Sequence, residues 1–307
     1  MVWLDAQVVP GIDGLGYGLL LFLVASGLTL AYGVGGILNL AHGALCALGA
    51  YTAAVLSHGT WGNLGLALAA GCAVGAAGGG ALAVLVAPLA GRGPLDQALL
   101  TVGVALVGAD LLGTATGGSA LPVVVPAAVA GTTSVAGHRY PVYRLLVIVV
   151  ALAIAIVGYL ALVRTRAGRV VRATVADPDM VACVGISPTR VRTWVLVASG
   201  ALAGVAGAIG APIIGAGPGT AESVLLLSVV VVVVGGLGCV PGALVAAIGV
   251  GEVQTLGISV LPDWVAPYLL YAAAGAALLL RGRPLRRRRP ATTTAPASRR
   301  RVDGGRV

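Results

Sequence analysis

The chain has 307 residues, of which 58% are hydrophobic and 9% charged, and its mean hydropathy is +1.02. Soluble domains carry roughly a quarter charged residues, so this composition excludes an ordinary soluble protein and predicts an all-α, polytopic membrane helix bundle. All 19 basic residues are arginine, which excludes a phosphate-binding loop with its lysine and therefore a P-loop ATPase. Any ATP that drives this protein must be hydrolysed by another chain.

Nine apolar segments are predicted to cross the membrane. A span needs about 20 apolar residues, and the 78 residues from Gly14 to Gly91 contain no Asp, Glu, Lys or Arg. The seventh segment is short, and an eight-span arrangement, in which residues 223–261 cross once or dip back, is the alternative. The predicted spans are Gly14–Val34, Leu40–Leu56, Leu64–Ala90, Asp96–Leu112, Tyr143–Val163, Thr193–Pro212, Ser223–Val234, Ala243–Leu261 and Val265–Leu280.

The positions of the arginines predict which ends of these spans face the cytoplasm. Nine crossings with the N-terminus outside and the C-terminus in the cytoplasm place 17 of the 19 arginines inside, leaving Arg139 and Arg144 outside. This asymmetry agrees with the excess of basic residues in cytoplasmic loops. Eight crossings would put the ten arginines of the tail outside. We expect a transmembrane domain at 1–280, an external loop at 113–141, and a disordered tail at 281–307 that contacts membrane lipid and no nucleic acid.

Eight charged side chains gather in one island, residues 164–192, between two uncharged stretches. Asp177 followed by Pro178 is typical of an N-cap and a first helical residue. Gly185 indicates a helix end, and Ser187-Pro188 indicates the start of the next helix. The pattern predicts one short helix, from about Pro178 to Gly185, in a cytoplasmic loop.

Asn39, His42 and Gly43 follow a spacing of three and four at the start of the second predicted span. This spacing would place an amide, an imidazole and bare backbone on one helix face, which makes them candidates for a solute pathway. The alternative is structural: Asn39 caps the helix, and His42 bonds a carbonyl group of a neighbouring helix.

The run of residues 35–45 is echoed by residues 235–244, and both begin with a Gly-Gly pair. Glycine-interrupted segments in matching halves of a transporter point to its pathway. Gly235 and Gly236 therefore join the pathway candidates, with chance recurrence of Gly-Gly turns as the alternative.

Asp110 and Glu252 are the acids that lie deepest in apolar surroundings. An unpaired charge at membrane depth costs at least about 2.5 kcal/mol, so each needs a partner, a proton or a wet cavity. Both lie toward the outer half of their predicted spans, which favours a solvated or hydrogen-bonded structural role. The alternative is a self-sufficient proton-coupled carrier that uses one of them.

Four blocks of sequence carry a family resemblance. In chain order they read SGLTLAYGVGGILNLAHGALCALGAY, ADPDMVACVGISPTRVR, SGALAGVAGAIGAP and VVVVVVGGLGCVPGALVAAIGVGEVQTLG. Together they resemble the branched-chain amino acid permeases of bacterial ABC importers, the first of the two permease types. The resemblance covers roughly residues 14–280.

The resemblance implies a transport subunit without catalysis of its own, in a bacterial inner or plasma membrane. An extracytoplasmic solute-binding protein would deliver branched-chain amino acids, and a second permease subunit would complete the pathway. Two cytoplasmic ATP-binding subunits would use ATP and Mg, and neither a cofactor nor a metal is expected on this chain. Urea and short amides are the alternative solutes, because permeases for them belong to the same superfamily.

The island would then couple this chain to the ATPase, with a short helix seated in a groove of that subunit. The positions that match the coupling element are Asp177, Pro178, Ala182, Gly185, Ile186, Ser187 and Pro188.

Overall fold

A computed structural model describes residues 7–36, 39–89, 92–135 and 137–260, together with the single positions 268, 272, 275 and 276. Six of its helices are long and apolar enough to cross a membrane, and two apolar helices, α3 and α10, are shorter. The helices are α2 (Val8–Gly35), α3 (His42–Leu56), α4 (Trp61–Val86), α5 (Pro94–Ala115), α6 (Val142–Arg164), α7 (Arg166–Ala176), α8 (Pro178–Cys183), α9 (Pro188–Ile214), α10 (Thr220–Gly235) and α11 (Val240–Val260).

Eight of the nine predicted spans coincide with helices α2 to α6 and α9 to α11. The short seventh segment is α10, and α10 and α11 are two separate helices where the alternative had one crossing or a segment that dips back. Apart from four single positions, the ninth span, Val265–Leu280, lies outside the described residues, and so does the whole tail, 281–307.

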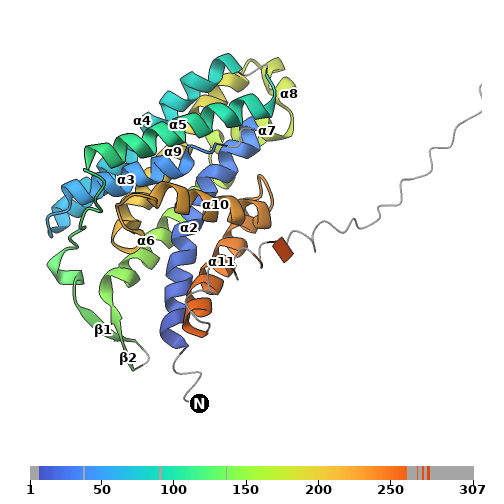
Figure 1. Cartoon of the computed structure of the whole chain (residues 1–307). Helices are drawn as coiled ribbons and strands as arrows, with labels where there is room; N and C mark the ends of the chain where they lie inside the picture. The colour runs from blue at the N-terminus through green and yellow to red at the C-terminus, as the bar shows by residue number, and fades with distance from the viewer. Residues whose placement is uncertain are drawn as a thin grey trace, which may run out of the picture.

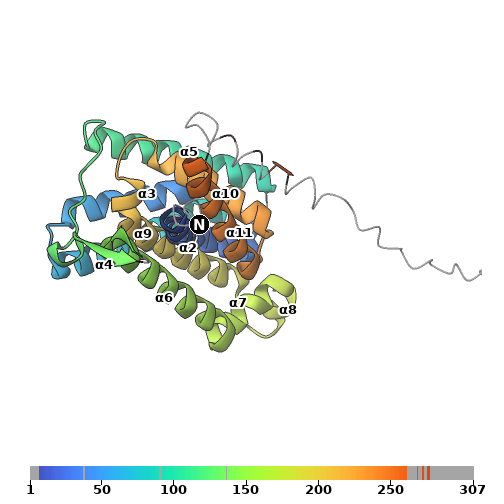
Figure 2. The same cartoon turned by 90° about the horizontal axis from the view of Figure 1, so that it is seen from below.

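Helices α2 and α9 form the centre of the bundle, as Figures 1 and 2 show. In the most apolar part of α2, 78% of the residues are buried, against 6% in α5. Leu23 and Leu28 of α2 and Ile209 of α9 are almost completely buried. The peripheral helices instead expose apolar side chains, which is the pattern expected where a bundle meets lipid.

Small residues let α4 and α9 approach closely. Gly71, Gly75 and Gly79 recur every four residues along α4 and face Gly200 and Gly204 of α9. A methyl group at Gly75 would overlap the carbonyl oxygen of Gly200. Small residues at this spacing are typical of helix contacts in membranes, where backbones touch directly. The glycine-rich composition is therefore used for packing at this contact.

The two ends of the bundle carry different structures. The end called here the hairpin end carries the antiparallel strands β1 (Thr132–Val135) and β2 (His138–Pro141), within the segment predicted as an external loop. The opposite end, called the island end, carries α7 and α8 (Figure 1). Two helices lie there, so the prediction of one short helix in the island was incomplete.

The arginines divide between these ends as the sequence predicted. Arg139 and Arg144 lie at the hairpin end, in β2 and in the first turn of α6. Arg92 follows α4, whose Val86 packs with Leu196 of α9 toward the island end. The six arginines of the island lie at the last residue of α6, in α7 and in the first turns of α9, so most of the described arginines share one end.

Candidate functional site

Helix α7 folds back tightly on the last turn of α6. The Thr165 hydroxyl caps α7 by accepting a hydrogen bond from the Gly168 amide at 3.0 Å. A side chain at Gly168 would overlap the Leu162 carbonyl oxygen, and that same oxygen accepts a hydrogen bond from the Arg172 guanidinium. These contacts fix α7 to the end of a membrane span.

The predicted caps of α8 are confirmed. The Asp177 carboxylate accepts hydrogen bonds from the Asp179 and Met180 amides, each at 3.0 Å, and Pro178 is the first helical residue. The helix ends at Cys183, and Gly185 turns the chain with a φ of +83°, a left-handed conformation that favours glycine. Pro188 then begins α9, directly after Ser187.

One face of α8 is apolar and exposed. Val181 is buried beneath the helix, whereas Met180 and Val184 are 63% and 68% exposed, and Ile186 lies beside them at 36%. Of these exposed residues, only Ile186 was among the predicted coupling positions. The spacing of four between Met180 and Val184 was the signal for the other two, because it places both on one side of a helix.

The island is attached to the central helices. Val170 and Val171 of α7 pack in one cluster with Val34 of α2 and with Val191 and Val195 of α9. A displacement of α7 and α8 would therefore act on the two helices that form the core of the bundle.

The two Gly-Gly turns meet at this same end. Gly36 and Gly236 end α2 and α10 with positive φ angles, and Gly33 and Gly238 approach so closely that a methyl group on either would lie 3.5 Å from the Cα atom of the other. A side chain at Gly235 would overlap the backbone of Ala243. The sequence echo thus corresponds to two neighbouring tight turns.

His42 makes the contact proposed as its structural alternative, a hydrogen bond to a carbonyl group of a neighbouring helix. Its side chain is fully buried, and its Nε2 atom lies 2.7 Å from the Val24 carbonyl oxygen of α2, to which it must donate. Gly43 packs against the Ala221 carbonyl of α10. A role of these residues in solute passage stays a prediction.

Asn39 does not share a helix face with His42, because α3 begins only at His42. The Asn39 side chain accepts a hydrogen bond from the Ala41 amide at 3.1 Å, which forms a turn before the helix. Its expected position on one face was therefore wrong, and so was its expected role as the N-cap, which is Ala41.

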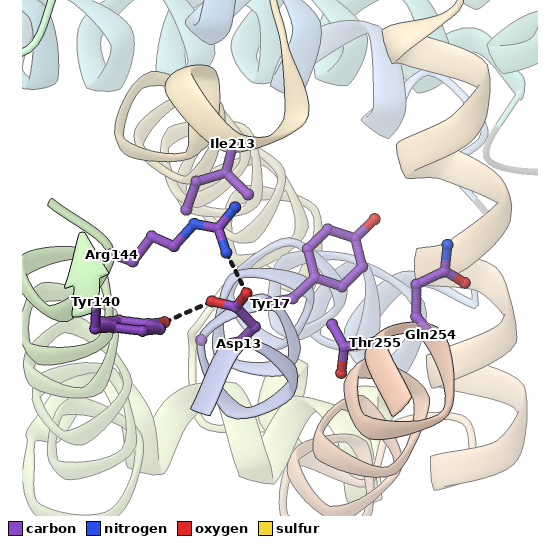
Figure 3. A pocket seen from close by; sticks show the side chains of 8 residues that line it. Asp13, Tyr17, Tyr140, Arg144, Ile213, Gln254 and Thr255 are labelled. Carbon is purple, nitrogen blue, oxygen red and sulfur yellow. Dashed lines mark hydrogen bonds and ion pairs between the residues drawn. The ribbon is translucent and has the colours of Figure 1, made fainter. Parts of the chain in front are cut away.

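At the hairpin end, an ion pair joins two distant parts of the sequence. Asp13 of α2 accepts a hydrogen bond from the Tyr140 hydroxyl at 2.6 Å and forms a salt bridge with Arg144 (Figure 3). Burial, assisted by the bond to Asp13, raises the pKa of Tyr140, so its phenol stays protonated and keeps donating. The sequence placed Arg144 outside but did not reveal this partner, which lies 131 positions away.

Comparison with known proteins supports one family. A family model described as branched-chain amino acid transport system / permease component matches residues 12–280. The chain is 28% identical to the high-affinity branched-chain amino acid transport system permease protein BraD of Pseudomonas aeruginosa, over 89% of this chain and 95% of that protein. It is 27% identical to the probable branched-chain amino acid transport permease protein LivH of Methanocaldococcus jannaschii, over 87% of this chain and 83% of that protein.

No solved structure matches the chain. The family model nevertheless covers all the described helices except the first residues of α2, and it includes the island with its caps and both Gly-Gly turns. By its apolar helices the chain is a multi-pass membrane protein, and by its sequence it belongs to the permease components of branched-chain amino acid transport systems.

Proposed function

We propose that the chain is a membrane-spanning permease subunit of an ABC importer that moves branched-chain amino acids across a bacterial inner or plasma membrane. Both relatives are named as branched-chain amino acid transport permeases, and the match to each covers more than four fifths of both chains. The proposed orientation has the N-terminus outside and the C-terminus in the cytoplasm. It follows from the arginines gathered at the island end, which we assign to the cytoplasm.

The observation that carries the proposal is the exposed apolar face of α8. Large apolar side chains at an exposed helix end are costly in water and mark a contact with another protein. Met180 projects from α8 and Val184 directly follows its last residue; Val181 beneath them is buried, and the neighbouring α7 packs against α2 and α9. A cytoplasmic ATP-binding subunit would cover this face, and its movement would reach the core of the bundle through α7.

A second permease subunit is part of the proposal. Asp110 lies on the exposed side of α5, a helix with few buried residues. Asp110 lies toward the outer end of α5, where a carboxylate facing lipid costs less than the about 2.5–3.5 kcal/mol of mid-span, but a protein surface beside it is still favoured over lipid. We assign α5 to the region that contacts the partner permease.

The remaining parts of the importer lie on other chains. ATP and Mg would be used by the two ATP-binding subunits, since this chain has no lysine for a phosphate-binding loop. An extracytoplasmic solute-binding protein would deliver the amino acid at the hairpin end. Transport of urea or short amides, and proton-coupled transport through Asp110 or Glu252, are the alternatives to test.

Replacement of Met180 by Asp tests the docking surface. A charge at the centre of the apolar face should weaken capture of the ATP-binding subunits by about tenfold or more, since it would be desolvated on contact. Met180→Leu keeps volume and apolarity, and serves as the matched control with unchanged capture. Co-purification of the membrane subunits with the ATP-binding subunits measures both. Normal capture by the Met180→Asp variant would remove α8 as the docking element.

A further inference from the structure

A groove lies on the side of the bundle at the island end, where α6, α7 and α9 meet. Its volume is about 660 Å³, within the range of about 300–1,000 Å³ that is typical of ligand sites. Along α9 it follows three successive turns, which contribute Arg190, Trp194 and Ala198. In Figure 2, α6 and the α5 helix assigned above to the partner permease lie on opposite sides of α2. The groove therefore stays open to lipid in the proposed importer.

The floor of the groove is apolar. Val191 and Val195 of α9 are buried, and they pack with Val170 and Val171 of α7, which line the groove with them. Among the described lining residues, only Arg190 is charged. A polar ligand would find few partners along this floor, whereas an acyl chain fits it because lipid tails are as apolar as the valines.

Arg190 lies at the depth expected for phospholipid head groups. Helix α9 has 27 residues, which span about 40 Å at 1.5 Å per residue, whereas the hydrocarbon core is about 30 Å thick. Its first and last turns therefore extend into the head-group layer. Trp194 is 71% exposed, and exposed tryptophans gather at the membrane surface. Arg190 is one turn nearer the start of α9 than Trp194, at the level of the phosphates.

The charge of Arg190 is not neutralised within the described part of the chain. Among the described residues, the only ion pair joins Arg144 with Asp13 at the opposite end. A guanidinium presents its N–H groups in a planar fork that fits a phosphate group. Basic pockets between membrane helices on the cytoplasmic side bind anionic lipid head groups in this way. The groove thus places a phosphate-binding group at the entrance to an apolar floor.

We infer that this groove binds one anionic phospholipid of the cytoplasmic leaflet. Arg190 pairs with the phosphate group, and one acyl chain runs past Trp194 toward Ala198 along the floor. The lipid contacts the same valine cluster that attaches α7 to α2 and α9, so it stabilises the position of the island. This inference goes beyond the proposed function and does not depend on which solute the chain carries.

Fluorescence of Trp194 tests the site directly. The full chain is purified from the membrane in detergent, with any subunits that stay bound to it. It is titrated with phosphatidylglycerol or phosphatidylcholine whose acyl chains carry bromine, which quenches a tryptophan on contact. Subtracting the signal of the Trp194→Phe variant isolates the quenching of Trp194.

Phosphatidylglycerol should reach half-maximal quenching of Trp194 at a concentration at least about tenfold lower than phosphatidylcholine. The reason is that phosphatidylcholine carries its own cation beside the phosphate, which weakens the charge-assisted hydrogen bonds to Arg190. Equal half-maximal concentrations for the two lipids would overturn the inference.

Two arginine variants separate a defined site from the general positive charge of the island. Arg190→Gln should raise the half-maximal concentration of phosphatidylglycerol by about tenfold and leave that of phosphatidylcholine unchanged. Arg169→Gln is the matched control, because Arg169 is exposed on the side of α7 opposite to Ala167 and Val170, which line the groove. It should change neither value. Equal effects of the two variants would show diffuse attraction and contradict the site.

The acyl-chain contact has its own test. Ala198→Phe fills the far part of the groove without a change of charge, so it should weaken quenching by both lipids severalfold. Ala153→Phe on the exposed side of α6, outside the groove, is the control and should have no effect. Unchanged quenching in Ala198→Phe would refute the assigned path of the chain. Inorganic phosphate should not reverse the quenching; if it does, the site binds free phosphate and the lipid assignment fails.

Discussion

At the residue scale, Gly185 controls how α8 connects to α9. Its φ of +83° is strained for any residue with a Cβ atom, although no neighbouring atom lies within 4 Å of the position that a Cβ would take. A substitution there would therefore change backbone conformation and not packing. Because the Gly185 turn joins the exposed face of α8 to the first turn of α9, its conformation sets the direction in which α8 points.

Gly185→Val should leave the protein in the membrane but separate ATP hydrolysis from uptake. Forcing a β-branched residue into this conformation costs about 1–3 kcal/mol, which the chain can avoid by reorienting α8. The ratio of solute transported to ATP hydrolysed measures the effect, and it should fall severalfold.

Gly118→Val is the control for this prediction. Gly118 has a similar φ of +71° and equally open surroundings, but it follows α5, far along the chain from the island. The Gly118→Val variant should lose about as much stability as Gly185→Val, but its ratio of solute transported to ATP hydrolysed should stay unchanged. Normal coupling in Gly185→Val, or the same loss of coupling in both variants, would count against α8 as the coupling element.

Some residue roles could be predicted from the sequence, and others could not. Asp177, Pro178 and Gly185 act through neighbours within a few positions, so their roles in capping and turning were predictable. His42 and Asp13 act through partners 18 and 131 positions away. No local pattern specifies such contacts, because they depend on how whole helices pack.

At the element scale, the contact between α4 and α9 depends on glycine at defined positions. The two helices meet through their backbones at Gly75 and Gly200. In lipid, such contacts are stabilised by van der Waals packing, since no hydrophobic effect favours helix association there. The contact should therefore be sensitive to a single added methyl group.

Gly75→Ala should lower the free energy of unfolding by about 1–3 kcal/mol, the usual cost of overpacking a tight contact. Gly65→Ala on the same helix is the matched control, because Gly65 is exposed and has no atom near the site of a Cβ. It should be neutral, or stabilised by up to about 1 kcal/mol through helix propensity. Thermal unfolding in detergent compares the two. Equal stability of both variants would refute close packing at this contact.

The sequence predicted eight of the described helices as spans and also predicted α8, but it missed α7. The apolar residues Ala167, Val170 and Val171 follow helical spacing together with the buried Thr174, and arginines lie between them. The same arginines are the signal for a cytoplasmic loop, which by itself predicts no helix. The hairpin was missed for another reason, since four-residue strands are too short for a clear alternation.

At the scale of the whole molecule, the two ends receive different partners in the proposed importer. The island end carries most of the described arginines and an exposed apolar helix, which suits a cytoplasmic protein contact. The hairpin end carries the ion pair of Asp13 with Arg144, and there the proposed importer would receive the solute-binding protein. Helices α2 and α9 run between these ends through the core. They are therefore the elements through which events at one end would reach the other.

Eight of the nine predicted spans could be recognised as helices from composition, because apolar length is a global property of the sequence; the ninth lies almost wholly outside the described residues. The family followed from four ordered blocks, and the match over residues 12–280 confirms it. What composition could not supply was the burial of α2 and the exposure of α5. Both helices are apolar throughout, and only packing distinguishes a central helix from a peripheral one.

Uptake by reconstituted proteoliposomes tests the central claim most directly. The chain is assembled with a second permease subunit, the ATP-binding subunits and the solute-binding protein, and labelled leucine, isoleucine, valine and urea are supplied separately. We predict accumulation of the three amino acids that requires both ATP and the solute-binding protein, with no accumulation by the chain alone under a pH gradient. Accumulation by the chain alone without ATP, or uptake of urea in place of the amino acids, would contradict the account.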